Sequence, residues 1–404
     1  MGTKDALSKI KNYNEQLILR NIYLHGPIAR IELAKKLKLS PTAVSDLTRD
    51  LLKKKLIIDN SVRIPQDNNG AGRPGRGVVF NPDAGRVFVV KEETKYLDGA
   101  ILNLSGEILY RTKIEYDINQ GYESFLKQLT GLVDNLIAQN ENNEIWGIGI
   151  IVRGVVVNNK VYMHSQHKGW GKVDLHSAIL KKYNLSPYIL NYPNSAAVGE
   201  LKHDINKKLN NILYINWGMS IGMGIIINRK LYEGSSGMSG EIGHVVVDDK
   251  SSKRCYCGKY GCMEAVATGK SLIDNIKSSL KDGVSSALEK YTDNLNIRII
   301  IREALKGDKL AHSKLKEKFS FMGRGLAVLS NIFDPDAILI GGEMIYAGEE
   351  FLNVLKIEYL EEMMSIPIVG VEENNRIKVQ YTDVNDLNVF LGGVTVIVDD
   401  IVGV

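Results

Sequence analysis

The sequence predicts an α/β protein built from a small basic N-terminal module and a larger body with two lobes. The chain has 404 residues, which is enough for two or three domains. Its net charge of +4 is unevenly divided: residues 1–86 hold sixteen Lys and Arg against eight Asp and Glu, a net +8, which leaves −4 for the rest. Beyond residue 86, strand-like apolar runs alternate with helical patterns, as in α/β proteins.

The composition excludes several classes of protein. Hydrophobic residues make up 44% and charged residues 24% of the chain, and no apolar run approaches the ~18 residues of a membrane span. The N-terminal residues carry charges where a signal peptide has an apolar stretch, so we expect a cytoplasmic protein without a membrane partner. Three cysteines are too few for a disulfide scaffold.

The basic module, residues 1–80, has the pattern of a winged helix-turn-helix. Apolar periodicity predicts helices over residues 14–24, 30–37 and 41–52. Ser40 is a suitable N-cap and Pro41 a suitable first-turn residue of the third helix. Residues 56–58 and 77–80 are predicted to be the two strands of the wing.

The third helix is predicted to face DNA. Thr42, Ser45 and Arg49 lie on its outer face, where short hydroxyl side chains and an arginine can reach base edges in a major groove. Ser40 and Pro41 at its start belong to the same surface. The alternative is a three-helix bundle with a solvated charged face, and the local excess of positive charge favours DNA.

Residues 66–77 form a wing or linker that is rich in glycine and asparagine. Arg73 and Arg76 flank a Pro-Gly step, and extended arginines of this kind enter the narrow minor groove of A·T-rich DNA. A flexible linker without DNA contact is the other interpretation of this segment.

The body is predicted to consist of a first lobe over residues 81–200, completed by a C-terminal helix over about 386–404, and a second lobe over 201–385. Expected strands are 87–90, 100–104, 145–152, 188–190, 212–217, 224–227 and 337–340, with a turn around 97–99. Expected helices are 122–139, 175–183, 195–201, 270–280, 297–305, 310–333 and 349–364.

The three cysteines fall within eight positions and follow a histidine. His244, Cys255, Cys257 and Cys262 make a set of one nitrogen and three sulfur ligands, which suits a structural zinc ion in a loop over residues 244–264. Four protein ligands leave no open coordination position, so the metal would not be hydrolytic. The alternative is three buried free thiols and an unrelated histidine.

Three motifs resemble those of the ROK family, which comprises repressors, uncharacterised reading frames and sugar kinases. They are Gly240-Glu241-Ile242-Gly243-His244, the Cys-x-Cys-Gly-x-x-Gly-Cys-x-Glu run that ends at Glu264, and Phe333-Asp334-Pro335 followed by Ile340-Gly341-Gly342. The resemblance covers nearly the whole chain. It implies an actin-like, two-lobed sugar-kinase fold and a homodimer or a dimer of dimers.

The helix-turn-helix further resembles that of the family's xylose- and N-acetylglucosamine-responsive repressors. By this resemblance, Glu241, His244, Glu264 and Asn191 match positions that hold sugar hydroxyls, with His244 using one ring nitrogen for zinc and the other for the sugar. Arg153-Gly154 and the stretch from His167 to Trp170 depart from the common family residues, and Tyr192 adds an aromatic face for a pyranose. These departures predict an altered sugar preference.

The segments that family kinases use for phosphoryl transfer are changed in three places. The stretch 91–95 (KEETK) has no glycine for phosphate and carries two carboxylates, and Met219 replaces the threonine of the second glycine loop. Tyr192 occupies the place of the catalytic aspartate, and a phenol is a poor base at neutral pH. The sequence therefore predicts no kinase activity.

We therefore interpret the chain as a sugar-responsive repressor that binds a pseudo-palindromic operator as a dimer. Sugar binding is expected to change the closure of the lobes and the spacing of the two DNA heads. The first alternative is a bifunctional sugar kinase with a DNA-binding head. The second is an architectural DNA-binding protein whose body only dimerises.

Overall fold

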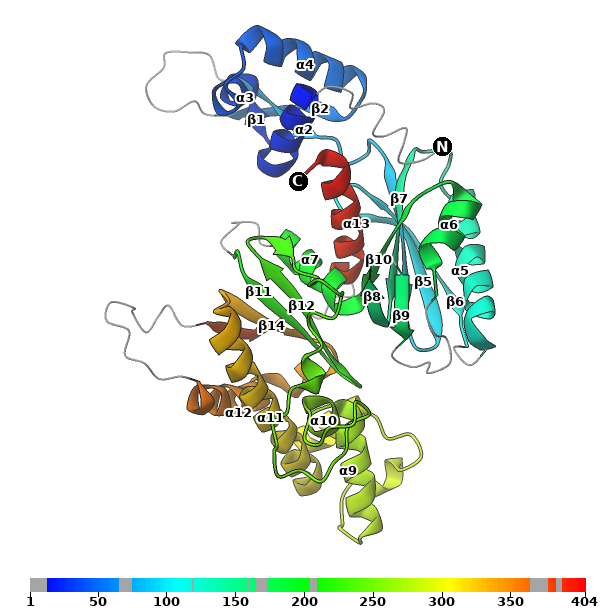
Figure 1. Cartoon of the computed structure of the whole chain (residues 1–404), viewed down its shortest axis with the longest axis vertical. Helices are drawn as coiled ribbons and strands as arrows, with labels where there is room; N and C mark the ends of the chain where they lie inside the picture. The colour runs from blue at the N-terminus through cyan, green and yellow to red at the C-terminus, as the bar shows by residue number, and fades with distance from the viewer. Residues whose placement is uncertain are drawn as a thin grey trace, which may run out of the picture. The chain divides into compact units, whose positions relative to one another are not determined.

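The computed structural model describes residues 13–64, 75–117, 120–157, 160–164, 173–203, 209–363, 377–382 and 387–404 (Figure 1). The chain forms two compact units, Met1–Gly199 with Val389–Val404, and Glu200–Asn388. In the described part of the chain, no helix has both the length and the apolar character needed to cross a bilayer.

The N-terminal head is a winged helix within the first unit. Helices α2 (Tyr13–His25), α3 (Arg30–Leu37) and α4 (Pro41–Lys53) pack on a sheet of order β1-β3-β2, formed by Ile28–Ala29, Gly75–Phe80 and Ile57–Ile64. Leu19, Leu33 and Val44 are fully buried and form the core of the head with Leu51. The expected helices and wing strands are confirmed, and β1 is an additional short strand.

The rest of the first unit is built around a five-stranded sheet of order β10-β7-β4-β5-β6. Its strands are β4 (Arg86–Glu92), β5 (Tyr96–Asn103), β6 (Ile108–Glu115), β7 (Ile145–Val152) and β10 (Pro187–Asn191), with a separate hairpin of β8 (Gly154–Val157) and β9 (Lys160–His164). The helices are α5 (Gly121–Ala138), α6 (Leu175–Tyr183), α7 (Tyr192–His203) and the C-terminal α13 (Leu387–Val402).

Alternation along β4 gives this sheet two buried faces. Phe88 and Val90 belong to the apolar cluster that includes Leu129 of α5, whereas Val89 contacts Gly393 of α13. Both faces are covered, which explains why β4 reads as an unbroken apolar run.

The expected turn around residues 97–99 is wrong, because Leu97, Asp98 and Gly99 lie inside β5. Asp98 is fully buried, and Arg111 of β6 donates to both of its carboxylate oxygens at 2.9 and 2.6 Å. This paired cation allows a turn-favouring residue to sit in the middle of a strand. The turn lies instead at residues 93–95.

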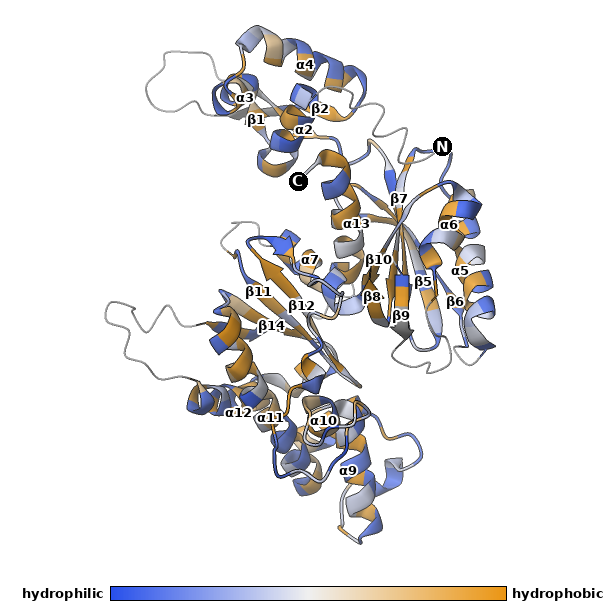
Figure 2. Cartoon of the chain, in the orientation of Figure 1, coloured by the Kyte–Doolittle hydropathy of each residue, from blue (hydrophilic) through white to orange (hydrophobic). Residues whose placement is uncertain are grey.

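The second unit contains a sheet of order β13-β12-β11-β14-β15 with helices packed on it. Figure 2 shows β11 and β14 as mostly hydrophobic. The strands are β11 (Ile212–Trp217), β12 (Ile221–Ile227), β13 (Lys230–Leu231), β14 (Ala337–Gly341) and β15 (Lys378–Tyr381). The helices are α8 (Met263–Val266), α9 (Gly269–Lys281), α10 (Ile297–Leu305), α11 (Lys309–Phe333) and α12 (Gly348–Glu362), with short 3-10 turns at Ile242–His244, Glu289–Tyr291 and Glu343–Ala347.

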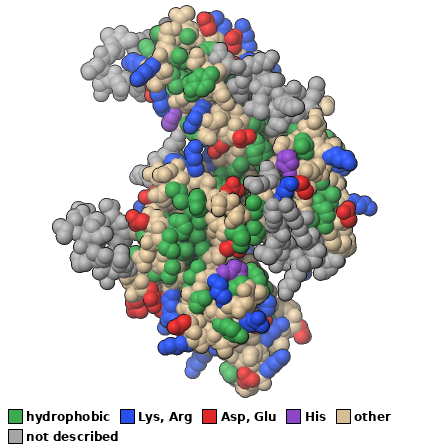
Figure 3. Space-filling view, in the orientation of Figure 1, with side chains coloured by type: hydrophobic (Ala, Val, Ile, Leu, Met, Phe, Trp, Pro, Cys, Tyr) green, Lys and Arg blue, Asp and Glu red, His purple; other side chains and the backbone are tan. Residues whose placement is uncertain are grey.

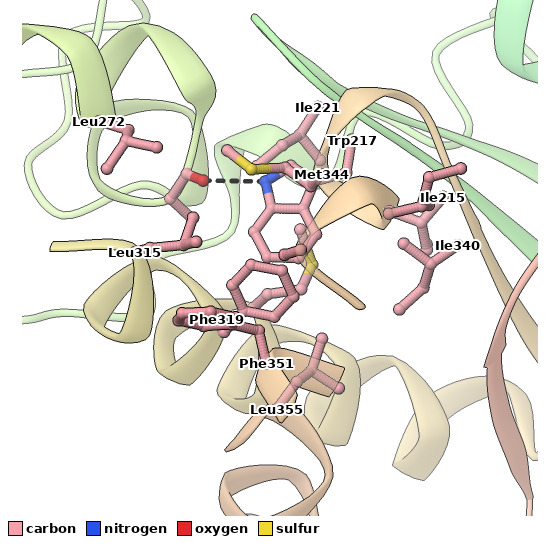
Figure 4. Packing of buried hydrophobic residues seen from close by; sticks show 14 of the residues in the cluster. Ile215, Trp217, Ile221, Leu272, Leu315, Phe319, Ile340, Met344, Phe351 and Leu355 are labelled. Carbon is pink, nitrogen blue, oxygen red and sulfur yellow. Dashed lines mark hydrogen bonds between the residues drawn. The ribbon is translucent and has the colours of Figure 1, made fainter. Parts of the chain in front are cut away.

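Aromatic side chains hold the helices of this unit to its sheet (Figure 4). The ring of Phe319 lies 4.5 Å from that of Trp217 and 5.5 Å from that of Phe351, measured between centroids. The Trp217 indole donates a hydrogen bond of 2.9 Å to the Ala267 carbonyl, so its one polar atom is satisfied inside the core. This contact ties β11 to the residue that follows α8 and therefore to the end of the cysteine loop.

Candidate functional site

Four potential metal ligands converge in the second unit. One nitrogen or sulfur atom from each of His244, Cys255, Cys257 and Cys262 lies within 4.8 Å of the others. The Cys255 Sγ lies 3.5 Å from the His244 Nδ1, and the Cys257 and Cys262 sulfurs are 3.7 Å apart. The predicted set is therefore brought together, and a nitrogen with three sulfurs at this separation could hold a metal ion.

The loop closes around these ligands because two glycines adopt positive φ angles. Gly258 has φ +96° and Gly261 φ +70°, and a Cβ at Gly261 would lie 1.8 Å from the Asp248 carbonyl oxygen. The Cys255 N–H, which precedes both glycines, donates to the Lys259 carbonyl at 2.8 Å, and this hydrogen bond folds the chain back on itself. The backbone alone thus places Cys257 beside Cys262.

The thiols need a cation to become ligands. Burial raises the pKa of the Cys262 thiol to about 12 and also raises that of Cys255. The backbone N–H of Lys259 lowers the pKa of Cys257. Thiolates are the metal-binding form, so a bound ion would stabilise the two buried sulfurs as anions.

His244 shows one departure from expectation. Its Nδ1 faces the sulfur cluster, but its Nε2 lies 3.0 Å from the hydroxyl of Tyr256. This second nitrogen was expected to face the sugar, and a contact with Tyr256 was not expected. The position of that tyrosine between two cysteine ligands was the available signal.

Two carboxylates lie beside this histidine. Glu264 lies in the first turn of α8, and its Oε2 accepts a 3.1 Å hydrogen bond from the Ile221 N–H. Burial raises the pKa of Glu264 to about 7 and also raises the pKa of Glu241. In the described part of the chain neither forms an ion pair. Two half-buried acids without a cation suit hydrogen bonding to neutral hydroxyl groups.

The predicted sugar contacts of the first unit lie around the ends of β7 and β10. Asn191 is buried, and its Oδ1 accepts from the Asn194 N–H at 2.9 Å, which caps α7. Tyr192 is the first residue of α7, three residues before the expected start. Gly154 begins β8, and His167 lies outside the described residues.

An ion network fills the turn that corresponds to a kinase phosphate loop. Lys91 is fully buried and lies 2.8 Å from the Glu93 carboxylate. The Arg153 guanidinium donates to the Thr94 hydroxyl at 3.0 Å and lies 3.8 Å from Glu93, while its backbone N–H donates to Glu92 at 3.1 Å. Arg153, predicted as a ligand contact, is thus held by this turn.

The head exposes the predicted face of α4. Thr42 and Arg49 are exposed and Ser45 is half-buried, whereas Val44, Thr48 and Leu51 face the core. The Ser40 hydroxyl accepts from the Ala43 N–H at 3.2 Å, so Ser40 and Pro41 begin the helix as expected. On the side of the head that Figure 3 shows, Lys and Arg side chains lie among Asp and Glu side chains. Arg73 lies outside the described residues, and of Arg76 only the backbone, in β3, is described.

Two family models match this chain. Residues 94–386 match the family model described as the ROK family. The chain belongs to the ROK family. In this ROK protein, residues 11–67 also match the model of the MarR family.

Curated relatives of this ROK protein are named as regulators. It is 28% identical to a xylose repressor of Caldicellulosiruptor bescii, over 97% of this chain and 96% of the relative. It is 30% identical to a xylose repressor of Bacillus spizizenii, over 86% and 87% of the two chains. The DNA-binding transcriptional dual regulator NagC of Escherichia coli is 26% identical, over 86% and 84%.

One solved regulator structure matches nearly the whole chain, whereas a solved kinase structure matches about three quarters of it. A ROK family transcriptional regulator, a homolog of the E. coli MLC protein, matches with a TM-score of 0.82 and 25% identity over 98% of both chains. A ROK family glucokinase from Streptomyces griseus matches with a TM-score of 0.63 and 23% identity, over 77% of this chain and 99% of the kinase. The kinase likeness concerns the fold alone.

Proposed function

We propose that this protein is a sugar-responsive transcriptional repressor of carbohydrate-utilisation genes. The observation that supports this proposal most is that one chain contains both a winged helix and a ROK body. Helix α4 of the winged helix exposes hydroxyl and arginine side chains. The likeness to proteins named xylose repressors extends over both parts, which supports a common role. The protein acts in the cytoplasm, where its operator is accessible.

The DNA contacts follow from the head. Helix α4 enters a major groove with Thr42, Ser45 and Arg49 toward the bases. Its N-terminal turn at Ser40 and Pro41 approaches the backbone, and Arg73 and Arg76 of the wing reach an A·T-rich minor groove. One head covers a half-site, so the operator is pseudo-palindromic and the protein binds as a homodimer or a dimer of dimers.

The sugar contacts follow from polar groups in both units. Glu241 and Glu264 accept hydrogen bonds from sugar hydroxyls, and His244 lies beside them on the metal loop. In the first unit the contacts are Asn191, Tyr192, Arg153, Gly154 and His167. The metal is zinc, held by His244 and the three cysteines, and it fixes the loop that carries the histidine and leads into Glu264.

The protein has no kinase activity in this proposal. The turn that would cradle phosphate is occupied by the ion pairs of Lys91 and Arg153 with Glu93. Met219 exposes an apolar side chain in the second loop, and Tyr192 cannot serve as a general base at neutral pH. The carboxylates of Glu92 and Glu93 in this turn would repel ATP phosphates.

The decisive experiment measures the effect of sugars on DNA affinity. Binding sites are first selected from random double-stranded DNA with the full-length protein. Fluorescence anisotropy on the selected site is then repeated with D-xylose, N-acetylglucosamine, glucose and other mono- and disaccharides. We expect one sugar to weaken binding at least tenfold. A protein that binds the site equally with every sugar would be an architectural DNA-binding protein instead.

A second assay tests the kinase alternative. ATP consumption is followed in a coupled assay with the same sugars. We expect no turnover above the rate without sugar, and sugar-dependent turnover would establish the bifunctional alternative.

A further inference from the structure

Tyr256 of the metal loop contacts His244 through its hydroxyl and its ring. It lies between two of the cysteine ligands, and its hydroxyl oxygen is 3.0 Å from the His244 Nε2. The two rings meet edge to face, with centroids 4.9 Å apart and planes at 84°. The tyrosine is 66% exposed, so hydrophobic burial does not account for this position.

The chemistry of a metal-bound histidine indicates which atom donates the hydrogen bond between His244 and Tyr256. A neutral imidazole that offers Nδ1 to a metal carries its proton on Nε2, and that N–H requires an acceptor. Metal-binding histidines generally donate this proton to an oxygen, which fixes the tautomer and the ring orientation. The Tyr256 hydroxyl is the oxygen in that position, and Nδ1 faces Cys255.

We propose that Tyr256 is a positioning residue that holds His244 in its metal-binding tautomer. This role concerns metal affinity alone and does not depend on the proposed sugar response.

The loop offers a matched comparison in Tyr260. Tyr260 is 54% exposed and lies between Cys257 and Cys262. Among the described residues, its hydroxyl makes no hydrogen bond. Tyr256→Phe and Tyr260→Phe each delete one hydroxyl from an exposed ring of the same loop. Any difference between them reports the contact with His244 rather than loss of an aromatic surface.

The test measures zinc affinity by competition with a chromogenic chelator at fixed pH on the full-length protein. We expect Tyr256→Phe to weaken zinc binding about tenfold, as loss of an oxygen acceptor behind a ligand histidine does. Tyr260→Phe should stay within about twofold of the wild type. Equal zinc affinities for the two variants would overturn the proposal, and equal melting temperatures of the zinc-free forms would show that both variants fold.

Discussion

Lys318 places a charged group in the interior of the second unit. Its side chain is fully buried in α11, and its Nζ lies 3.1 Å from the Glu317 carboxylate. Lys253 and Lys314 lie close enough to oppose its charge electrostatically. Burial is the main cause that lowers the pKa of Lys318 to about 8. At neutral pH the buried lysine is still charged, and keeping it charged lowers the free energy of unfolding.

We predict that Lys318→Met stabilises the protein at pH 7. The unfolded lysine has a pKa near ~10.4, so protonating the buried group costs the folded state about 3 kcal/mol, and removing it should raise the free energy of unfolding by about 2 kcal/mol. A lowered pKa means that wild-type stability falls as the pH drops from 10.4 to 8. The gain in the variant should therefore shrink as the pH rises through this range.

Urea denaturation of both proteins between pH 7 and 10 tests this prediction. Lys314→Met, a substitution one turn earlier in a partly exposed lysine with the same glutamate as partner at 3.6 Å, is the control and should change stability by less than about 1 kcal/mol. Destabilisation by Lys318→Met at pH 7 would show that the Glu317 pair outweighs burial.

At the scale of elements, α4 tests the DNA proposal with little risk to the fold. Arg49 is exposed and paired only to Asp46 at 2.9 Å in the described structure, and such surface pairs contribute below about 1 kcal/mol. We predict that Arg49→Ala weakens operator binding by about 1–3 kcal/mol and leaves the melting temperature unchanged.

Anisotropy titrations against the selected site and against unrelated DNA measure this change. A loss confined to the selected site indicates base contact, whereas an equal loss on both DNAs indicates a phosphate contact. Unchanged affinity for both would remove Arg49 from the interface. Lys53→Ala, one turn closer to the C-terminal end of the same helix, tests whether the loss is specific to Arg49.

The metal loop depends on one glycine more than on the other. At Gly261 a methyl group would overlap the Asp248 carbonyl and also require a positive φ, whereas at Gly258 it would meet open space. We predict that Gly261→Ala lowers zinc affinity about 100-fold, from a combined cost of about 3 kcal/mol for overlap and backbone strain. Gly258→Ala should cost about 1–2 kcal/mol. Equal zinc affinities in the chelator competition would contradict this account.

Most elements were predictable because their apolar periodicity is local. The strands at Ile145–Val152 and Ile212–Trp217 and the helices at Leu175–Tyr183 and Ile297–Leu305 match the expected ranges. β6 was missed although its burial alternates, and the position of Asp98 inside β5 depends on Arg111 from the neighbouring strand. A turn propensity is outweighed where a partner that is distant in sequence neutralises the residue.

Some residues of the candidate site could be predicted from the sequence and others could not. The metal ligands were predictable because their spacing within one loop is itself the signal. The contacts of Arg153 were not, since they join residues about 60 positions apart, and a sequence without its fold cannot place them together. The sugar contact of Arg153 stays a prediction, and the structure adds that its guanidinium contacts the turn after β4.

At the scale of the whole molecule, the proposed metal site and the proposed DNA surface belong to different units. The four candidate metal ligands lie in Glu200–Asn388, and the head lies in Met1–Gly199. Removal of zinc should therefore leave sugar-free DNA binding within about twofold, while the loop that carries His244 and precedes Glu264 loses its fixed geometry. The sugar response should be lost, because a ligand shifts DNA affinity only through the contacts that distinguish the two states.

Anisotropy of labelled operator DNA with the releasing sugar, before and after treatment with 1,10-phenanthroline, measures this separation. We expect the chelated protein to remain bound to DNA at sugar concentrations that release the untreated protein, and added zinc to restore release. Release that persists after chelation would show that the sugar is sensed without the metal loop. Loss of DNA binding without sugar would show instead that zinc maintains the fold beyond its own unit, since metal binding and folding free energies are coupled.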